Sequence, residues 1–521
     1  MLKKLEQLTL EEKIGQLIVF GFHEDHYASN IENLIKNHKL GNILLFSRNV
    51  SSSEKLFILN KNIQKAMLKY LQIPAFITAD QEGGMVTRLF GDATIFPGAM
   101  AISAANNPHN AYLSGLYMAD EMDALGINVN FAPVLDVNNN PLNPVIGVRS
   151  YSDRPEVVSE YANQYISGLQ SKVIATAKHF PGHGDTHVDS HLDLPHVDFG
   201  KQRLHEMELY PFKKAIKNNL KAVMGAHIVY QDITNGMPAT LSKEALTDLL
   251  RGELGFTGLV FTDGMEMKAI LNRYGAVESA VPAILAGANL LLYCHHEDQQ
   301  IAAAKVIKEA VLDGTLPLEV LNERVARILK YKAELNLDIV KQDYQDVKPR
   351  VGNKIHREFA QNILNQALTL VKGKPFKAQG KTLFISQSPQ ATTFADLTDG
   401  KSNTIEILKD VLPQFDYYQA QINPTADEIN KLKDMALKYD QIVLTSYNSN
   451  VFKNQIKLLK ELVQTKKELH VISLRNPYDH YLVPEIENYV CLYEYTANSV
   501  NTLKDYLLGK IKPKGKLPIN V

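Results

Sequence analysis

Eight short apolar runs alternate with longer segments of helical pattern along residues 16–294, and this alternation constrains the fold more than any other feature. The runs are QLIVFGF (16–22), GNILLFS (41–47), AFITAD (75–80), INVNFAPVLDV (127–137), VIATAKHF (173–180), AVMGAHIVY (222–230), GLVFTDGM (258–265) and ANLLLYC (288–294). Nearly continuous hydrophobicity is typical of parallel strands that are buried on both faces. Segments such as 53–70 and 155–170 predict helices between them. Eight strand–helix units within about 300 residues predict an α/β fold, a (β/α)8 TIM-type barrel.

Polar side chains stand where five of these runs end. They are Asp80, Asp136, Lys178 with His179, His227 and Asp263. Because the strands of such a barrel are parallel, their carboxyl ends meet at one face, and barrel active sites lie at that face. The sequence therefore predicts an active site built from the ends of the third to the seventh strand.

A second α/β pattern follows the barrel. A helical stretch over 318–335 leads into a polar segment, LDIVKQDYQDVKPRVGN, with the composition of a linker. Strand candidates then alternate with helical segments such as 426–439 and 454–465. These candidates are KTLFISQ (381–387), QIVLTSYN (441–448), ELHVISLRNP (468–477) and VCLYEYT (490–496). We predict a catalytic barrel over 1–335, a linker over 336–354 and a smaller α/β/α sandwich over 355–521.

Charge and composition exclude several classes of partner. The net charge is −1, so neither nucleic acid nor an anionic membrane is expected. No apolar run reaches membrane-spanning length, and the first residues, MLKKLEQLTLEEKIGQL, contain no secretory apolar core. The two cysteines, Cys294 and Cys491, favour a reducing compartment over a disulfide framework. We therefore expect a cytoplasmic protein, whose oligomeric state the sequence leaves open.

The segment KHFPGHGDTHVDSH (178–191) carries a histidine at every fourth position. On a helix this spacing would stack four imidazoles on one face and indicate a metal site. Pro181 and Gly182 interrupt a helix, and the segment has neither a cysteine partner nor a His-Glu-x-x-His pattern, so we expect no metal. A second hypothesis is an acid/base loop in which Asp189 orients His191. A third is a solvated, turn-rich loop, and spacing alone leaves the last two open.

This segment closely resembles the signature of the β-N-acetylglucosaminidases of glycoside hydrolase family 3, in the NagZ-like branch and its two-domain form. Further blocks resemble the family in the same order, namely ITADQEGGMVTR (77–88), FAPVLDV (131–137), NPVIGVRSYS (143–152), LVFTDGMEMKAI (259–270), SLRNPYD (473–479) and GKLPINV (515–521). The resemblance covers essentially the whole chain. It implies an exo-acting retaining enzyme that releases terminal GlcNAc from small saccharides, such as cell-wall fragments carrying muramic acid, through a covalent glycosyl-enzyme.

The resemblance also implies roles for individual residues. Asp263 matches the nucleophile, His191 the general acid/base, and Asp189 the carboxylate that orients His191. Contacts to the sugar are implied for Asp80, Arg88, Arg149, Lys178 and His179, and neither a metal nor a cofactor is implied. At Gly264 the chain departs from its relatives, which often carry a side chain after the nucleophile.

Other functions stay open on the sequence. The nearest is a β-N-acetylglucosaminide phosphorylase, in which phosphate instead of water intercepts the same intermediate. A β-glucosidase or xylosidase, a non-catalytic sugar-binding protein and a metal-dependent hydrolase are further alternatives. The role of the second domain is open too, with Arg475 and Asp479 as candidates for side chains that face the barrel.

Overall fold

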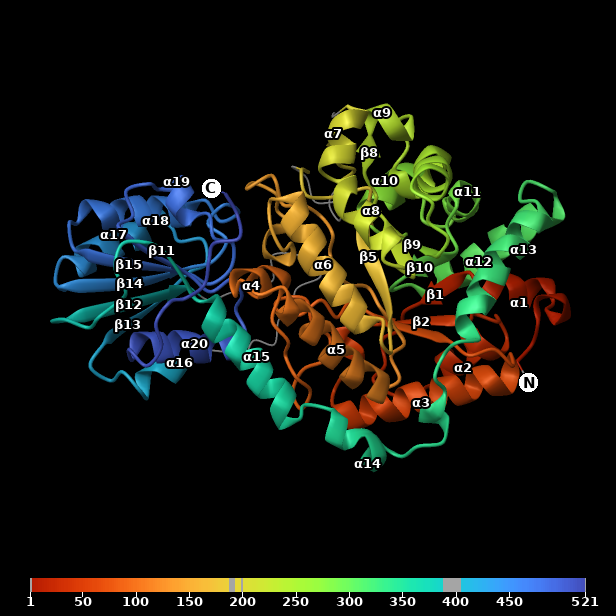
Figure 1. Ribbon diagram of the computed structural model, residues 1–521, viewed down its shortest axis with the longest axis horizontal. Helices are drawn as coiled ribbons and strands as arrows, with labels where there is room; N and C mark the ends of the chain where they lie inside the picture. Colours follow the sequence, from red (N-terminus) through yellow and green to blue (C-terminus); the bar gives the residue numbers. More distant parts are fainter. Residues whose placement is uncertain (1, 187–192, 198–199, 388–403, 521) are drawn as a thin grey trace.

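The computed structural model describes residues 2–186, 193–197, 200–387 and 404–520 (Figure 1). Within these residues, eight parallel strands close a barrel in the order β1-β10-β9-β7-β5-β4-β3-β2. The strands are β1 (Ile18–Phe20), β2 (Asn42–Leu45), β3 (Phe76–Ala79), β4 (Val129–Asn130), β5 (Ile174–Phe180), β7 (Ala222–Gly225), β9 (Leu259–Gly264) and β10 (Leu290–Tyr293). Each lies within one of the predicted runs, so the barrel prediction is confirmed.

Helices cover the outside of the barrel, and the local sequence explains where two of the predicted ones begin. α3 (Ser53–Tyr70) follows Ser52, whose side chain accepts a hydrogen bond from the Lys55 amide. α6 (Pro155–Leu169) starts at a proline, which suits a first helical turn. The other helices are α1 (Leu10–Gly15), α2 (Ser29–Lys36), α4 (Ala99–Ala104), α5 (His109–Ala124), α7 (Lys201–Glu206), α8 (Leu209–Lys217), α9 (Gln231–Thr234), a π-helix (Glu244–Glu253), α10 (Lys268–Tyr274), α11 (Ala280–Ala286), α12 (Glu297–Leu312) and α13 (Leu318–Lys332). A short parallel pair, β6 (His196–Val197) and β8 (Val229–Tyr230), lies outside the barrel sheet.

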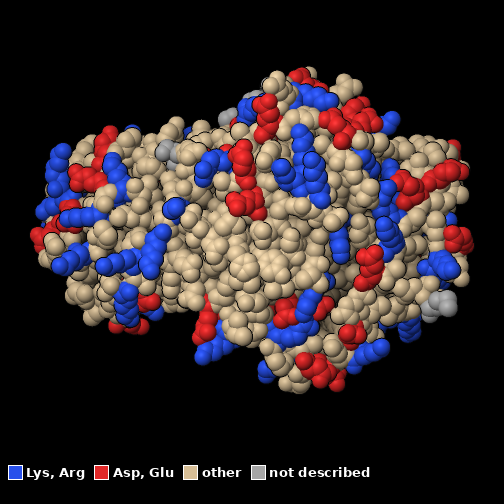
Figure 2. Space-filling view, viewed as in Figure 1, with Lys and Arg blue, Asp and Glu red and all other residues tan. Residues whose placement is uncertain are grey.

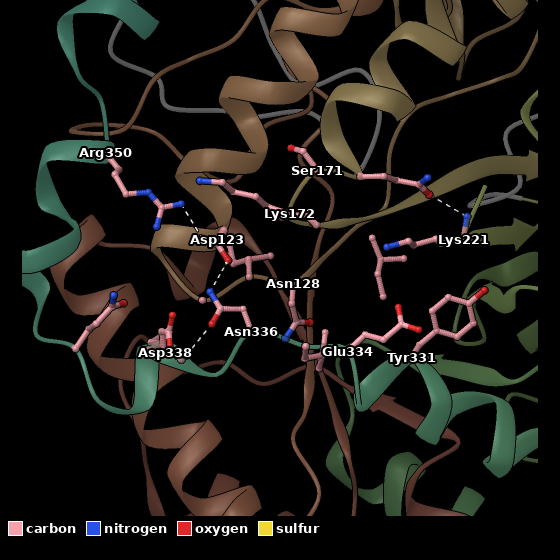
Figure 3. A pocket seen from close by; sticks show the side chains of 18 residues that line it. Asp123, Asn128, Ser171, Lys172, Lys221, Tyr331, Glu334, Asn336, Asp338 and Arg350 are labelled. Atoms are coloured by element: carbon pink, nitrogen blue, oxygen red, sulfur yellow. Dashed lines mark hydrogen bonds and ion pairs between the residues drawn. The ribbon is translucent and has the colours of Figure 1, made fainter. Parts of the chain in front are cut away.

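The segment predicted as a linker is folded against the amino-terminal face of the barrel. It contains α14 (Tyr344–Val347). Asn336 Nδ2 donates to Asp123 Oδ1 at 3.3 Å, and Arg350 Nη2 donates to Asp123 Oδ2 at 2.7 Å. These side chains border a cavity of about 200 Å3 (Figure 3). The cavity also borders Asn128 and Lys221, which directly precede β4 and β7, so it lies at the face opposite the expected active site. The limits 336–354 stay a prediction.

The second domain is a three-layer α/β sandwich. Its described residues form a mixed sheet in the order β11-β16-β15-β14-β12-β13, with β11 antiparallel to β16. The strands are β11 (Thr369–Lys372), β12 (Thr382–Gln387), β13 (Asp416–Ala420), β14 (Gln441–Ser446), β15 (Glu468–Ser473) and β16 (Asn488–Cys491). The helices α17 (Ala426–Ala436) and α18 (Asn454–Gln464) cover one face, and α16 (Thr404–Lys409) and α20 (Ala497–Leu507) cover the other (Figure 1). The predicted sandwich is confirmed. The remaining helices are α15 (Lys354–Ala367) and α19 (Asp479–Leu482).

The sequence prediction missed β11 and β13, and both are edge strands. β13 reads DYYQA, and its only buried residue is Ala420. An edge strand has one neighbour and less cover than an inner strand, so it need not show the continuous apolar run that reveals a buried parallel strand. The inner strands β12, β14, β15 and β16 all carry such runs and were predicted.

Apolar side chains of α4 join the barrel to the second domain. Met100, Ala101 and Ala104 belong to the same buried cluster as Leu444 and Val471 of the second sheet. Asp479, a candidate for facing the barrel, instead accepts hydrogen bonds from Ser446 Oγ at 2.7 Å and from Tyr489 Oη at 2.8 Å, both within its own domain. The start of α19 thus directs Asp479 into the second domain, and these contacts do not support it as a side chain that faces the barrel.

The surface carries both signs of charge. On the face drawn in Figure 2, basic and acidic side chains are interspersed. In the described part of the chain, no helix combines the length and the apolar character needed to cross a membrane. The expectation that nucleic acid is not a partner stays a prediction.

Candidate active site

A cavity at the carboxyl ends of the barrel strands contains six of the predicted site residues. Its volume is about 390 Å3. The predicted residues in its wall are Asp80, Arg88, Arg149, Lys178, His179 and Asp263. The other two, Asp189 and His191, lie outside the described residues. The structure therefore brings together the proposed nucleophile and all five proposed sugar contacts.

Two carboxylates stand on opposite sides of this cavity. Asp80 directly follows β3, and Asp263 lies near the end of β9. In the barrel order, three strands separate β3 from β9 in either direction, so the two strands are diametrically opposed. A ligand that fills the cavity would contact one carboxylate on each side.

An ion-pair cluster surrounds Asp80. Lys178 Nζ lies 2.8 Å from Asp80 Oδ1 and 2.7 Å from Glu82 Oε1. Arg149 binds Glu82 with two nitrogens, at 2.9 Å from Nε to Oε2 and 2.7 Å from Nη2 to Oε1. Arg88 Nη2 lies 3.7 Å from Asp80 Oδ2. Three cations therefore surround two carboxylates, and bidentate and charge-assisted contacts of this kind fix side-chain geometry.

Burial and charge together set the ionisation of this cluster. Burial by itself would raise the pKa of Glu82, but Arg149 and Lys178 outweigh it and hold that pKa far below its ordinary value. Burial would lower the pKa of Lys178, yet Asp80 and Glu82 raise it. The Asp80 side chain is 20% exposed, against 2% for Lys178. Asp80 is thus the carboxylate of the cluster that is best placed to accept hydrogen bonds from ligand hydroxyls.

Asp136 orients His179 from behind the cavity wall. Its Oδ2 lies 2.7 Å from His179 Nδ1, and its Oδ1 accepts from the His183 amide at 2.7 Å. Burial would raise the pKa of Asp136, but His179 lowers it, so the group is a carboxylate at neutral pH. A proton on Nδ1 leaves His179 Nε2 to interact with a ligand. Asp136 is 1% exposed and acts through His179.

The described start of the histidine-rich segment is a tight turn, as expected from Pro181 and the glycines. A Cβ on Gly184 would lie 1.6 Å from the Val137 carbonyl oxygen, so only glycine fits there. Asn143 Nδ2 donates to the His183 and Gly184 carbonyls at 2.8 and 3.0 Å. Burial and the neighbouring His179 lower the pKa of His183 to about 4, so its imidazole is neutral at pH 7. The non-helical prediction is confirmed for the residues up to 186.

Backbone contacts hold the Asp263 turn from two directions. Asp263 Oδ1 accepts from the Gly264 amide at 2.8 Å, and the Gly264 carbonyl is 3.0 Å from His227 Nε2. The Glu266 carboxylate accepts from the amides of His295 and His296, each at 2.9 Å. A Cβ on Gly264 would lie 3.3 Å from Cys294 Sγ, so a side chain at this position would require Cys294 to shift slightly.

Sequence reasoning missed part of this framework. Glu82 was not predicted as a site residue, although it stands two positions after Asp80. His227 was recognised at a strand end, but its contact with the Gly264 carbonyl could not be inferred. Glu266 lies within the block LVFTDGMEMKAI, and this proximity to Asp263 was the one available signal. Glu82 acts on Arg149 and Lys178, whereas His227 and Glu266 contact backbone groups around the Asp263 turn.

The fold and the cavity together define a class of protein. A barrel mouth that sets a carboxylate across from charged hydrogen-bonding groups can hold a polyhydroxy ligand against a nucleophile. Among enzymes this arrangement is typical of glycoside hydrolases.

Comparison with known proteins identifies the family. Residues 9–331 match the model described as Glycosyl hydrolase family 3 N terminal domain. A β-hexosaminidase A of Pseudoalteromonas piscicida is 30% identical, over 94% of this chain and 91% of the relative. The chain therefore belongs to glycosyl hydrolase family 3, and the expected glycoside hydrolase is confirmed.

Solved structures agree with this assignment. A family 3 β-N-acetylglucosaminidase from Paenibacillus sp. str. FPU-7 superimposes with a TM-score of 0.89 at 34% identity, and the match covers 98% of this chain and 99% of that one. A β-glucoside phosphorylase superimposes with a TM-score of 0.82 at 24% identity, which shows a shared fold. The two-domain organisation expected from the resemblance is thus found in a relative of nearly equal extent.

Proposed function

We propose that this chain is an exo-acting retaining β-N-acetylglucosaminidase that releases terminal GlcNAc from small glycosides, such as cell-wall fragments carrying muramic acid, in the cytoplasm. One observation carries the proposal: Asp263 lies across the barrel mouth from Asp80 and its cationic neighbours. The names of the Pseudoalteromonas and Paenibacillus relatives, a β-hexosaminidase and a β-N-acetylglucosaminidase, support the choice of sugar.

In the proposed complex the charged cluster holds the terminal sugar. Asp80 accepts hydrogen bonds from ring hydroxyls, and Arg88, Lys178 and His179 contact neighbouring polar groups of the same ring. Arg149 contributes through Glu82 and by its position in the cavity wall. Because ion pairs already fix these side chains, little conformational entropy is lost when the sugar binds.

The proposed reaction has two steps. Asp263 attacks the anomeric carbon while the bond to the leaving oxygen breaks, and His191 gives its proton to that oxygen. Water then attacks the glycosyl-enzyme, His191 takes the proton of this water, and Asp263 leaves as a free carboxylate. Asp189 orients the imidazole in both steps. A neutral imidazole adds no second negative charge beside Asp263, unlike the carboxylate pair of most retaining enzymes.

A product assay tests the function. We expect 4-nitrophenyl β-GlcNAc to be cleaved to GlcNAc with or without millimolar phosphate, and the matching glucoside to be cleaved more slowly. If GlcNAc-1-phosphate were the main product, the enzyme would be a phosphorylase and the proposed hydrolase function would be wrong. Cleavage of the glucoside without cleavage of the GlcNAc glycoside would replace the proposed sugar specificity with that of a β-glucosidase.

The role of His191 is tested by changing the leaving group. We expect His191→Ala to lower kcat/KM for a GlcNAc disaccharide by roughly 10²–10⁴-fold, the usual contribution of a general acid. The loss for 4-nitrophenyl GlcNAc should be much smaller, because nitrophenolate leaves without protonation. The exposed His109 gives a matched control, His109→Ala, with no expected change. Equal losses on both substrates would rule out the acid role.

A further inference from the structure

Two barrel loops carry four of the five residues of the charged cluster, Lys178 being on β5, and both loops touch the second domain. The loop between β3 and α4 contains Asp80, Glu82 and Arg88. The loop between β4 and α6 contains Arg149. The double contact between Arg149 and Glu82 joins the two loops to each other. Whatever fixes one loop therefore also constrains the other.

Glu494, which follows β16, binds the first loop. Its Oε2 accepts from the Gly98 amide at 2.8 Å, and its Oε1 accepts from Thr496 Oγ1 at 2.8 Å. Gly84 has a φ of +57°, and a Cβ there would lie 3.0 Å from Glu494 Oε2. Glu494 is 1% exposed, and burial raises its pKa to about 7. It therefore packs directly on the backbone two residues beyond Glu82.

Further side chains of the second domain hold the same loop. Asn498 Nδ2 donates to the Ile95 carbonyl at 3.0 Å, and the Tyr495 amide lies 3.2 Å from Met85 Sδ. Met85 itself packs into an apolar cluster of the second domain. One short stretch of the second domain, residues 494–498, thus contacts the loop at Met85 and again at Ile95 and Gly98.

Asn476, which follows β15, binds the second loop. Its Oδ1 accepts from the Val148 amide at 3.1 Å, directly before Arg149. Gly147 has a φ of +47°, and a Cβ there would lie 2.3 Å from Asn476 Oδ1. The same loop is held by Tyr478, whose hydroxyl accepts from Asn138 Nδ2, and by Asn450, whose Nδ2 donates to the Pro141 carbonyl at 3.1 Å.

We propose that Glu494 and Asn476 are positioning residues, through which the second domain sets the geometry of the sugar-binding cluster Asp80, Glu82, Arg88, Arg149 and Lys178. The assignment of that cluster to a sugar rests on the proposed function. The Asn476 contact ends on the amide directly before Arg149. The Glu494 contact ends on the Gly98 amide, and Gly98 packs against Gly84, two residues after Glu82. The Glu82–Arg149 pair connects the two loops. Through these contacts the second domain would act on substrate affinity by positioning the binding loops.

Paired variants test the proposal by KM and kcat for 4-nitrophenyl GlcNAc. We expect Glu494→Ala and Asn476→Ala to raise KM roughly 3- to 30-fold, because loosening a binding loop misplaces several contacts at once. Glu494→Gln and Asn476→Asp keep an acceptor for the same amides and should restore KM to within about twofold of the native value. Tyr478→Phe, a milder change, should raise KM less than Asn476→Ala.

Asn488→Ala is the matched control. Asn488 is a buried asparagine of the second domain that holds the Leu469 carbonyl and the Lys374 amide, at the opposite end of the strands from Glu494. We expect it to lower stability without changing KM. If Asn488→Ala raised KM as much as Asn476→Ala, or if both interface alanine variants kept the native KM, the proposal would be overturned.

Hydrogen–deuterium exchange separates this proposal from the proposed function. We expect both interface alanine variants to speed amide exchange in peptides covering residues 82–90 and 145–152, and Asn488→Ala to leave these peptides unchanged. If the native protein cleaves no GlcNAc glycoside, the proposed function fails, and the exchange still reports whether the second domain holds the loops. Unchanged exchange in both interface variants would refute the proposal even in an active enzyme.

Discussion

Asp263→Asn should lower kcat for 4-nitrophenyl GlcNAc on the order of 10⁴-fold or more, as expected when a covalent nucleophile is lost. The amide has nearly the size of the carboxylate and can still accept from the Gly264 amide, so the turn should keep its shape. Its nitrogen and oxygen are poor nucleophiles, so the first step stops. Steady-state kinetics measure the loss, and KM or an inhibition constant for GlcNAc should change little, because the sugar contacts lie on the far side of the cavity.

A second substitution at the same position identifies the chemical step. In Asp263→Gly, azide should restore turnover and give the glycosyl azide of inverted anomeric configuration, since the small anion then attacks from the face that the carboxylate occupied. Asp298→Asn, at an exposed position in the first turn of α12, is the matched control and should keep native kinetics. Retained anomeric configuration in the azide product, or substantial activity in Asp263→Asn, would contradict a nucleophilic role.

Glu82→Gln should cost about 3–5 kcal/mol in free energy of unfolding, because it leaves the buried cations Lys178 and Arg149 without a carboxylate between them. Glu11→Gln is the control, because the distance from carboxylate to lysine is the same in the Glu11 pair. Glu11 Oε1 lies 2.7 Å from Lys308 Nζ, as Glu82 Oε1 does from Lys178 Nζ, but both partners of the Glu11 pair are over 40% exposed. For that pair we expect a loss of at most about 1 kcal/mol. Denaturant titration of the three proteins gives the comparison.

The pH dependence of this difference has a definite sign. The pKa of Glu82 is depressed in the folded protein, while the ordinary value is 4.5. Its contribution to stability is therefore fully present above pH 4.5 and is lost as the pH falls towards the folded-state pKa. The gap between native protein and Glu82→Gln should narrow below pH 4.5. Two results would show that the stability of the cluster does not depend on this carboxylate. One is a stability difference between native protein and Glu82→Gln that widens below pH 4.5, and the other is equal stability of Glu82→Gln and Glu11→Gln at pH 7.

Much of the fold was predictable because each inner strand shows a nearly continuous apolar run in the sequence. Apolar runs revealed every barrel strand, and the polar residue at a run's end placed Asp80, Lys178, His179 and Asp263 at one face. β11 and β13 carry no such pattern, since edge strands need less apolar cover. The local sequence thus indicates which segments are buried, but it does not show which residues contact each other in the folded chain.

The remaining parts of the site depend on contacts between distant segments. Glu82 binds Arg149 from 67 residues away, and Asp136 binds His179 from 43. Nothing in the local pattern at Glu82 reveals its contact with Arg149, and the position of Asp136 at the end of an apolar run does not reveal its contact with His179. Arg88 and Arg149 were predicted through family resemblance, and their contacts appeared only with the folded loops. Asp189 and His191 lie outside the described residues, so their roles stay a prediction.

The helix α4 also bears on how the chain assembles during synthesis. Its Met100, Ala101 and Ala104 complete an apolar cluster whose other members come largely from the second domain. During translation α4 is synthesised long before the strands of that domain, and amino-terminal domains generally fold first. We therefore expect the second domain to fold onto the already formed barrel, so that the barrel assists the folding of the domain that later holds its loops.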